Sequence, residues 1–117
     1  MEPLRTTSNP VRRARALLER AARAERRQFL VDGPQGVREA LAGAGAVREV
    51  FVTEDCLQRH PDLTVHAVER GVPVHLTEAR ALRAMTSSVS PQGVVAVCDF
   101  VDEPLTTVLE RSSGRAV

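Results

Sequence analysis

The stretch GVVAV, residues 93–97, decides the fold of this chain. Its last four residues are contiguous, apolar and mostly β-branched, which predicts the strongest strand in the sequence. A second contiguous run, VFV at 50–52, predicts a strand over 47–53 that is buried on both faces. Strands of this kind need covering layers on both sides of the sheet, as in an α/β domain.

Weaker strands and further helices are expected around these two runs. The run 28–31 ends at the turn Asp32-Gly33-Pro34 and predicts a strand, and 72–76 predicts a short strand because Pro73 weakens its pairing. Helical spacing predicts three further helices, which carry Val37, Ala40 and Leu41; Leu63, Val65, Ala67 and Val68; and Ala81, Leu82 and Met85, the last after Thr77 as N-cap. The alternation of strands and helices predicts a sheet covered on both faces.

The first helix is predicted to begin at Pro10, because Ser8 and Asn9 offer capping side chains directly before it. Its expected buried stripe consists of Val11, Ala14, Leu17, Leu18, Ala21 and Ala22. Another face carries arginines three, four or seven residues apart, namely Arg13, Arg20, Arg23 and Arg27. The helix should therefore be apolar inside and cationic outside.

The charge of the chain is unevenly distributed. The net charge is +1, but residues 1–31 hold eight Arg against three Glu, a balance of +5, and residues 32–117 hold eight Arg against twelve acidic residues, a balance of −4. A basic segment beside an acidic body suits a polyanion, and guanidinium groups bind phosphate oxygens strongly. The alternative, a cationic face that only solvates the helix, stays open for one helix taken alone.

Length and composition favour one domain with an aliphatic core, since 117 residues include 43% apolar residues but three Phe and neither Trp nor Tyr. No apolar stretch reaches the length of a membrane span, and the polar, Arg-rich start does not resemble a signal peptide. We therefore expect a cytoplasmic protein with no membrane contact.

Candidate catalytic and metal-binding residues are few. Cys56 and Cys98 lack a second cysteine at short spacing, so we expect reduced, partly buried thiols. His60 lies four residues after Cys56, but isolated histidines fit surface positions better than a metal site. The loop Asp32–Gly36 lacks the Lys and Ser/Thr of a phosphate-binding P-loop, which favours a tight turn into a helix. No catalytic or metal-binding residue is expected, nor catalysis by residues 1–117 alone.

An ordered set of short motifs resembles the N-terminal substrate-binding domain of SpoU/TrmH-type RNA ribose 2'-O-methyltransferases. The motifs cover about residues 8 to 100 and are Ser8-Asn9-Pro10-Val11-Arg12, Leu17 or Leu18, Arg23 and Arg26, Phe29 to Gly33, Val37 with Ala40-Leu41, Val50 to Glu54, Gly71 to Val74, and Pro91 to Val97. Arg12 and Asp32 stand where the family usually has Lys and Glu, which keeps the charge at both positions but changes the reach of the side chain.

The resemblance implies an eL30-like fold, a single-domain three-layer α/β/α sandwich with a mixed sheet of about four to five strands. Residues 1–7 would be a flexible N-terminus, 8–101 the RNA-substrate-binding domain, and 102–117 a linker and the start of a SPOUT catalytic domain that is absent here. The resemblance implies no cofactor in this sequence, because S-adenosylmethionine would bind in the absent domain, through which the parent enzyme would form a homodimer. The partner would be structured RNA, with ribosomal RNA favoured over transfer RNA.

We expect RNA contacts at Asn9, Arg12, Arg13, Arg23, Arg26, Arg27 and Gln92. The arginines would contact phosphates, and the loops of Asn9 and Gln92 would set orientation, although the amide of Gln92 could instead tie its loop to Ser90. Because aromatic residues are scarce, binding would rely on the RNA backbone, its 2'-hydroxyls and its shape. The alternative hypothesis is a protein-interaction or dimerisation module of the same fold, in which the Ala-rich first helix packs against a partner.

Overall fold

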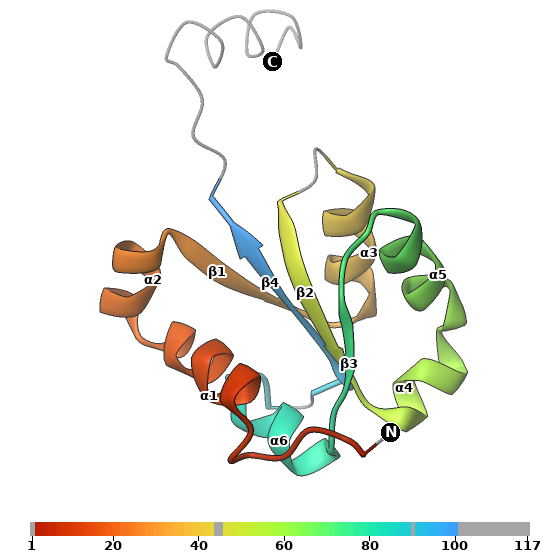
Figure 1. Cartoon of the computed structure of the whole chain (residues 1–117), viewed down its shortest axis with the longest axis horizontal. Helices are drawn as coiled ribbons and strands as arrows, with labels where there is room; N and C mark the ends of the chain where they lie inside the picture. The colour runs from red at the N-terminus through yellow and green to blue at the C-terminus, as the bar shows by residue number, and fades with distance from the viewer. Residues whose placement is uncertain (1, 44–45, 90, 101–117) are drawn as a thin grey trace, which may run out of the picture.

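The structure, a computed structural model, describes residues 2–43, 46–89 and 91–100 and contains a four-stranded sheet (Figure 1). The strands are β1 (Gln28–Asp32), β2 (Val47–Val52), β3 (Val74–Leu76) and β4 (Val94–Asp99). Their order is β1-β4-β2-β3, in which β4 is antiparallel to both neighbours and β2 is parallel to β3. The predicted mixed sheet is confirmed.

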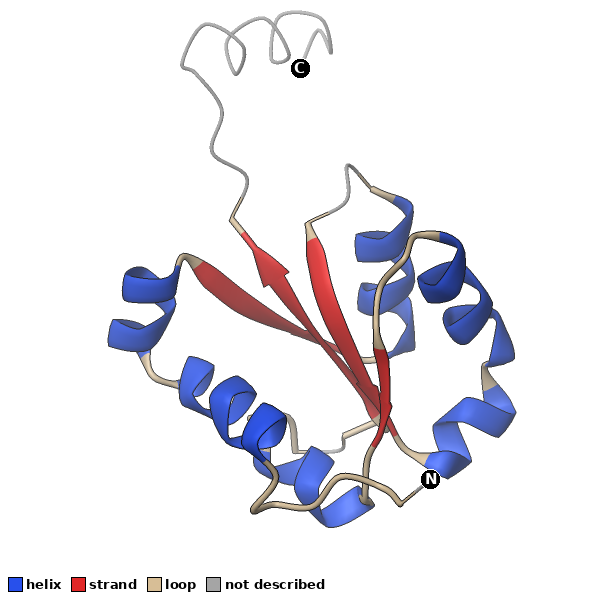
Figure 2. Cartoon of the chain, in the orientation of Figure 1, coloured by secondary structure: helices blue, strands red, loops and turns tan. Residues whose placement is uncertain are grey.

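Helices lie on both faces of this sheet (Figure 2). One layer consists of α3 (Pro34–Ala42), α4 (Glu54–Arg59) and α5 (Pro61–Glu69). The other layer consists of α1 (Asn9–Arg15), the 3₁₀ helix η1 (Ala16–Leu18), α2 (Arg20–Arg26) and α6 (Ala79–Ala84). The predicted three-layer α/β/α sandwich is therefore confirmed.

Successive residues of the central strands β2 and β4 serve two separate cores, because side chains alternate between the faces of a strand. The core shared with α3, α4 and α5 takes Val50, Val52, Val94, Ala96 and Cys98. The core shared with α1, η1 and α6 takes Phe51, Val95 and Val97. Phe51 is 0% exposed, and truncating such a residue to Ala costs about 3–5 kcal/mol. Contiguous apolar runs are thus what two-sided burial requires.

The predicted single first helix is wrong, because the chain forms α1, η1 and α2 instead. Val11, Ala14 and Leu17 are buried as expected. Leu18, however, is 36% exposed, and Ala21 is also exposed. The apolar stripe is therefore interrupted after η1, and of its last members only Ala22 packs against this core.

Arg23 explains why the chain can turn between η1 and α2. Glu19 is extended, with φ −88° and ψ 132°, so the last carbonyls of η1 cannot be reached by following helical N–H groups. The Nη1 atom of Arg23 donates to the carbonyls of Leu17 and Leu18, each at 3.0 Å. A side chain from the next helix therefore caps the preceding one.

The helix predicted through Leu63 to Val68 is confirmed as α5, whose core-facing side consists of Leu63 and Ala67, whereas Val65 and Val68 are exposed. Two smaller expectations need correction. Glu78, not Thr77, is the N-cap of α6, since the buried Thr77 hydroxyl donates to the carbonyl of His75 at 2.9 Å. The strand expected over 72–76 is limited to Val74–Leu76.

The segment before α1 contacts the edge of the sheet next to β3. Leu4 forms a parallel bridge with Thr77, in which Leu4 N donates to Leu76 O at 2.8 Å and Glu78 N donates to Leu4 O at 2.9 Å. These bonds hold Leu4 in place, and flexibility in the remainder of 1–7 stays a prediction. The predicted linker at 102–117 lies outside the described residues.

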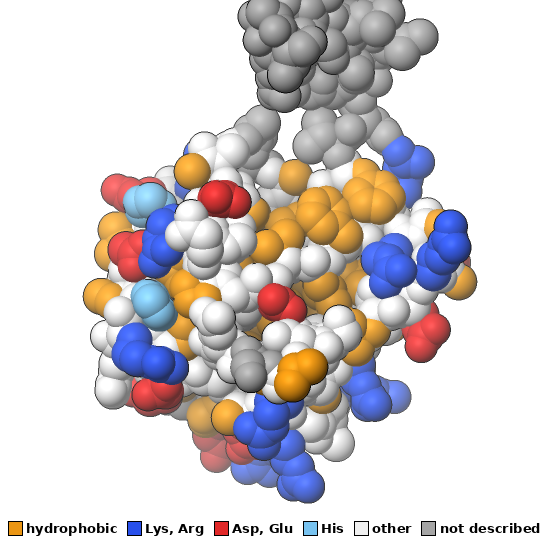
Figure 3. Space-filling model, turned by 180° about the vertical axis from the view of Figure 1, so that it is seen from behind, with side chains coloured by type: hydrophobic (Ala, Val, Ile, Leu, Met, Phe, Trp, Pro, Cys, Tyr) orange, Lys and Arg blue, Asp and Glu red, His pale blue; other side chains and the backbone are white. Residues whose placement is uncertain are grey.

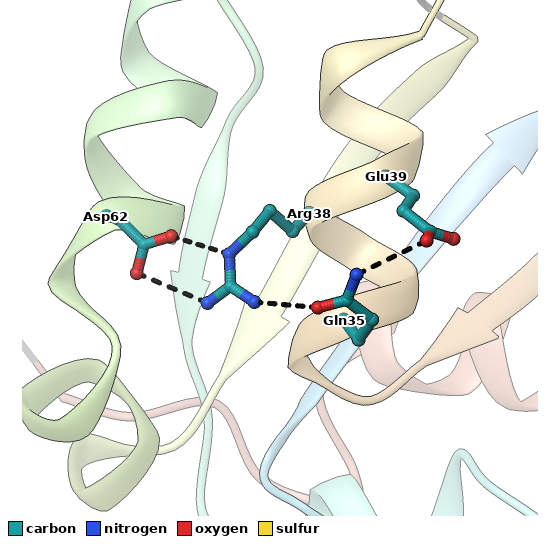
Figure 4. Close-up of polar contacts among 4 residues, drawn as sticks. All are labelled: Gln35, Arg38, Glu39 and Asp62. Atoms are coloured by element: carbon teal, nitrogen blue, oxygen red, sulfur yellow. Dashed lines mark hydrogen bonds and ion pairs between the residues drawn. The ribbon is translucent and has the colours of Figure 1, made fainter.

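An ion pair joins α3 to α5 on the surface (Figure 4). Arg38 donates to both carboxylate oxygens of Asp62, from Nε at 2.8 Å and from Nη2 at 3.4 Å, and its Nη1 donates to Gln35 Oε1 at 3.2 Å. The hydrogen bond from Arg38 lowers the pKa of Asp62. The pair therefore stabilises the fold above the ordinary Asp pKa, and this small contribution is lost as the pH falls through the lowered one.

Gly93 is the tightest glycine position among the residues that the structure describes. Its φ is +88°, and a Cβ atom there would lie 2.6 Å from Thr53 Oγ1 and 2.9 Å from Cys56 Cβ. Thr53 cannot easily retreat, because its hydroxyl accepts the Cys56 N–H as the cap of α4. Gly71 is a matched control, since its φ is +70° but nothing lies within 4 Å of the added atom.

We expect Gly93→Ala to lower the free energy of unfolding by about 2–5 kcal/mol, from about 1–2 for the left-handed backbone and about 1–3 for the overlap. Gly71→Ala should carry only the backbone cost of about 1–2 kcal/mol. Urea denaturation followed by circular dichroism measures both. Equal losses in the two variants would show that the loop at Gly93 relaxes away from Thr53.

Arg23→Ala should lower the free energy of unfolding by about 1–2 kcal/mol, because the carbonyls of Leu17 and Leu18 lose a charged donor, the first in a partly buried bond and the second in an exposed one. Arg20→Ala is the control, since within the described part of the chain the exposed Arg20 side chain has no hydrogen-bond or ion-pair partner. It removes the same charge from the same helix and should change stability by less than about 0.5 kcal/mol. Thermal denaturation measures the stability of both variants. Equal losses of stability would show that the effect comes only from the removed charge and not from the hydrogen bonds of Arg23.

Candidate nucleic-acid interface

The arginines of α1 project away from the core. Val11 and Ala14 anchor the helix, and Arg12, Arg13 and Arg15 follow in its last turn, where positive charge also interacts favourably with the helix dipole. The guanidinium groups of Arg12 and Arg13 are exposed, and neither has a hydrogen-bond or ion-pair partner among residues 2–43, 46–89 and 91–100. From behind, basic side chains are seen on the side of the molecule formed by α2 (Figure 3).

The arginines of α2 have additional structural contacts. Arg26 Nη1 donates to the carbonyl of Arg13 at 2.7 Å, which ties α2 back to α1. Arg27 ends α2 in the left-handed conformation, with φ +57°, and its carbonyl accepts the Phe100 N–H at 2.8 Å. Arg23 caps η1. A guanidinium has five N–H donors, so the one or two backbone contacts of Arg26 and Arg23 leave donors for a ligand.

A groove of about 310 Å³ lies between these helices and the sheet. Its charged and polar walls are Arg13 from α1, Arg26 from α2, Gln28 from β1, and Arg48 and Glu49 from β2. Ala14, Leu17 and Val97 supply the apolar part of the lining. Three guanidinium groups face one carboxylate, which makes the groove suitable for an anion.

The carboxylates around the groove already have partners. Asp99 accepts from Gln28 Nε2 at 3.0 Å and lies 3.5 Å from Arg48 Nε. Glu49 Oε1 lies 2.8 Å from His75 Nε2, on the neighbouring strand β3. The guanidinium groups of Arg13 and Arg26 have no carboxylate partner within the described ranges, so the positive charge of the groove is left open to a ligand.

Sequence reasoning found Arg13 and Arg26 but missed Arg48 and Gln28, the other two basic or amide residues of the groove. Helical spacing marked the first pair, whereas Arg48 and Gln28 lie at the starts of two strands, outside any helical pattern. The only signal was the position of each at the first or second residue of a strand. This position indicates a groove residue only when the strand order is known.

Asn9 and Gln92 do not line this groove. Asn9 is the exposed first residue of α1. Gln92 lines a separate cavity of about 420 Å³, at the end of the sheet where β2 and β3 finish and β4 begins, whose lining also includes Thr53, Leu76 and Leu82. The structure therefore brings together Arg13 and Arg26 of the predicted set and places Gln92 at the opposite end. The alternative contact of Gln92 with Ser90 lies outside the described residues.

The two thiols lie inside the core rather than at either site. Cys56 and Cys98 are free and are 0% and 2% exposed, so they are more deeply buried than expected. Burial raises the pKa of Cys56 and raises the pKa of Cys98 to about 11. The described part of the chain contains no group of three or more His, Cys, Asp or Glu residues arranged for a metal ion. None of its helices is long and apolar enough to cross a bilayer.

Comparison with known proteins matches residues 8–96 to the family described as the MRM3-like substrate binding domain. A curated relative, the 23S rRNA (guanosine(2553)-2'-O)-methyltransferase RlmP of Bacillus subtilis, is 33% identical over 79 residues. The aligned part is 68% of this chain but 29% of the relative. The chain thus spans less than a third of the length of that enzyme.

Two solved structures share the fold. An rRNA methyltransferase from Sinorhizobium meliloti has a TM-score of 0.72 and 23% identity, covering 89% of this chain and 39% of that one. The SpoU methyltransferase AviRb from Streptomyces viridochromogenes, in complex with AdoMet, has a TM-score of 0.64 and 20% identity, covering 85% of this chain and 38% of that one.

These matches agree with the ordered motifs over residues 8 to 100 and with the four-stranded sandwich. In each protein the similar region is a part of a larger methyltransferase. The resemblance predicted from the sequence is confirmed, and the chain belongs to the family of MRM3-like substrate-binding domains, which occur within SpoU/TrmH-type rRNA methyltransferases.

Proposed function

We propose that this chain recognises structured RNA, ribosomal RNA in preference to transfer RNA, for an S-adenosylmethionine-dependent ribose 2'-O-methyltransferase. Residues 8–101 would be the RNA-binding domain, and 102–117 would lead into a SPOUT domain that carries the catalytic residues. S-adenosylmethionine and the homodimer contacts of the parent enzyme would belong to that second domain. The chain by itself would bind RNA without transferring a methyl group.

The observation that carries this proposal is the open cationic surface of α1 and α2 within a substrate-binding family. Arg12 and Arg13 are exposed on a helix that Val11 and Ala14 hold against the sheet. Positive side chains on a rigid element suit a phosphate backbone, since phosphate contacts set position and supply salt-dependent affinity. Membership of a substrate-binding family supports RNA as the polyanion.

The proposed contacts differ among the predicted residues. Arg12, Arg13 and Arg26 would contact phosphates directly. Arg23 already donates to two carbonyls and would contribute chiefly by fixing the angle between η1 and α2. Contacts of RNA with Asn9, Arg27 and Gln92 stay predictions, and Gln92 would have to reach RNA from the far end of the sheet.

Arg12→Ala tests the cationic surface. With a transcript of the 23S rRNA region that contains the nucleotide modified by RlmP, the variant should bind about tenfold more weakly, which corresponds to the loss of one charged hydrogen bond. The slope of log affinity against log salt should fall by about 1, as expected for one phosphate contact. Fluorescence anisotropy over a salt series measures both quantities.

The matched control is Arg59→Ala on α4, which removes the same charge from the opposite helical layer. Arg59 pairs with Asp55 at 2.6 Å, and such an exposed pair contributes little to stability. Its RNA affinity should remain close to that of the unmodified chain. Equal weakening by both variants would indicate a general charge effect, and a stable dimer in sedimentation that ignores RNA would favour the protein-interaction alternative.

A further inference from the structure

We propose that the groove between α1, α2 and the sheet binds a single phosphodiester of the RNA backbone, with Arg48 on one wall and Arg13 and Arg26 on the other. This inference rests on the proposed function and names the place where one particular phosphate is held. It adds two residues of the sheet, Arg48 and Gln28, to a surface otherwise made of helical arginines.

A β-bulge turns Arg48 into the groove. Val47 pairs with Cys98 and Glu49 pairs with Val97, so one extra residue of β2 lies between two adjacent residues of β4. In a regular strand Val47 and Glu49 would share a face. Val47 instead packs on the core of α3 and α5, whereas Glu49 and Arg48 both line the groove on the opposite face. Bulges commonly re-aim a side chain in this way.

Contacts orient two of the three guanidinium groups, those of Arg26 and Arg48, before a ligand arrives. Arg26 is fixed to the Arg13 carbonyl by one hydrogen bond and keeps its remaining donors. Arg48 lies 3.5 Å from Asp99 through Nε, and Gln28 holds the other oxygen of that carboxylate. The terminal nitrogens of Arg48 therefore remain available. Preorganised donors reduce the entropy lost on binding.

The composition of the groove favours a phosphodiester over a base. Among the described residues, its lining contains no aromatic ring on which a base could stack. A volume of about 310 Å³ is at the lower end of the range for ligand pockets, which suits one small group.

The location of the groove favours RNA over a free phosphate. Arg13 lies on the same short helix as Arg12, so a strand bound across α1 can place one phosphate in the groove and a neighbouring phosphate beside Arg12. Glu49 opposes an anion, and its contact with His75 moderates that repulsion. Affinity for an isolated phosphate ion should therefore be weak. In RNA, contacts with neighbouring phosphates should supply the remaining affinity.

The test uses the 117-residue chain, the 23S rRNA transcript and the variants Arg48→Ala and Glu49→Gln. Arg48→Ala should weaken RNA binding about tenfold and lower the salt slope by about 1. Glu49→Gln should strengthen binding, because it removes the one carboxylate of the lining and retains a hydrogen-bonding side chain. Arg48 is 64% exposed at the side chain, so its loss should leave the melting temperature nearly unchanged.

A double-mutant cycle shows whether the two walls share a phosphate. The loss of RNA affinity in the double variant Arg13→Ala/Arg48→Ala should be smaller than the product of the two single losses by about threefold or more. The reason is that either single change already breaks the shared contact with one phosphate. Arg12→Ala with Arg48→Ala should be multiplicative, since Arg12 does not line the groove. Multiplicative losses in both cycles would overturn the shared site.

The remaining outcomes separate this inference from the proposed function. If Arg12→Ala weakens RNA binding and Arg48→Ala does not, the groove inference is wrong and the RNA-binding function stands. If the unmodified chain does not bind RNA, both are wrong. If inorganic phosphate at constant ionic strength raises the melting temperature only when Arg48 is present, while RNA affinity ignores Arg48, the site serves a small phosphate and the RNA subsite is refuted.

Discussion

The structure depends on the antiparallel pairing of β2 with β4, two strands that are buried on both faces. Val50 pairs with Ala96 and Phe51 with Val95, so each adjacent pair contributes to opposite cores. A shift of one residue would send Phe51 into the layer of α3 and α5, and this makes the register strongly specified. The helices on both sides and the groove beside α1 are positioned by this pair.

Much of the fold could be predicted from the sequence because two-sided burial leaves contiguous apolar runs. VFV at 50–52 and VVAV at 94–97 identify the central strands without knowledge of any partner. The break between η1 and α2 could not be predicted in this way. It depends on Arg23 reaching back to the carbonyls of Leu17 and Leu18, and residue spacing along a helix contains no information about such a contact.

The site was less predictable, because it combines arginines of one helical segment with residues of strands that are distant in the sequence. Arg12 and Arg13 follow from the spacing and charge of the first 31 residues. Gln92 was grouped with them, but it directly precedes Gly93 and β4, whereas Arg48 lies at the start of β2. Since β2 and β4 are antiparallel, their starts lie at opposite ends of the sheet, which separates Gln92 from the groove.

The bulge in β2 has a consequence for how this protein could change through single-codon deletions. Without residue 48, Val47 and Glu49 would be adjacent and would continue the regular ladder with Cys98 and Val97 on their present faces. The pairing of β2 with β4 does not require the additional residue, and its main effect is to place a guanidinium group beside α1. If the groove binds a phosphate as proposed, loss of that codon would leave the ladder intact and remove one ligand contact, so recognition could change without a change of fold.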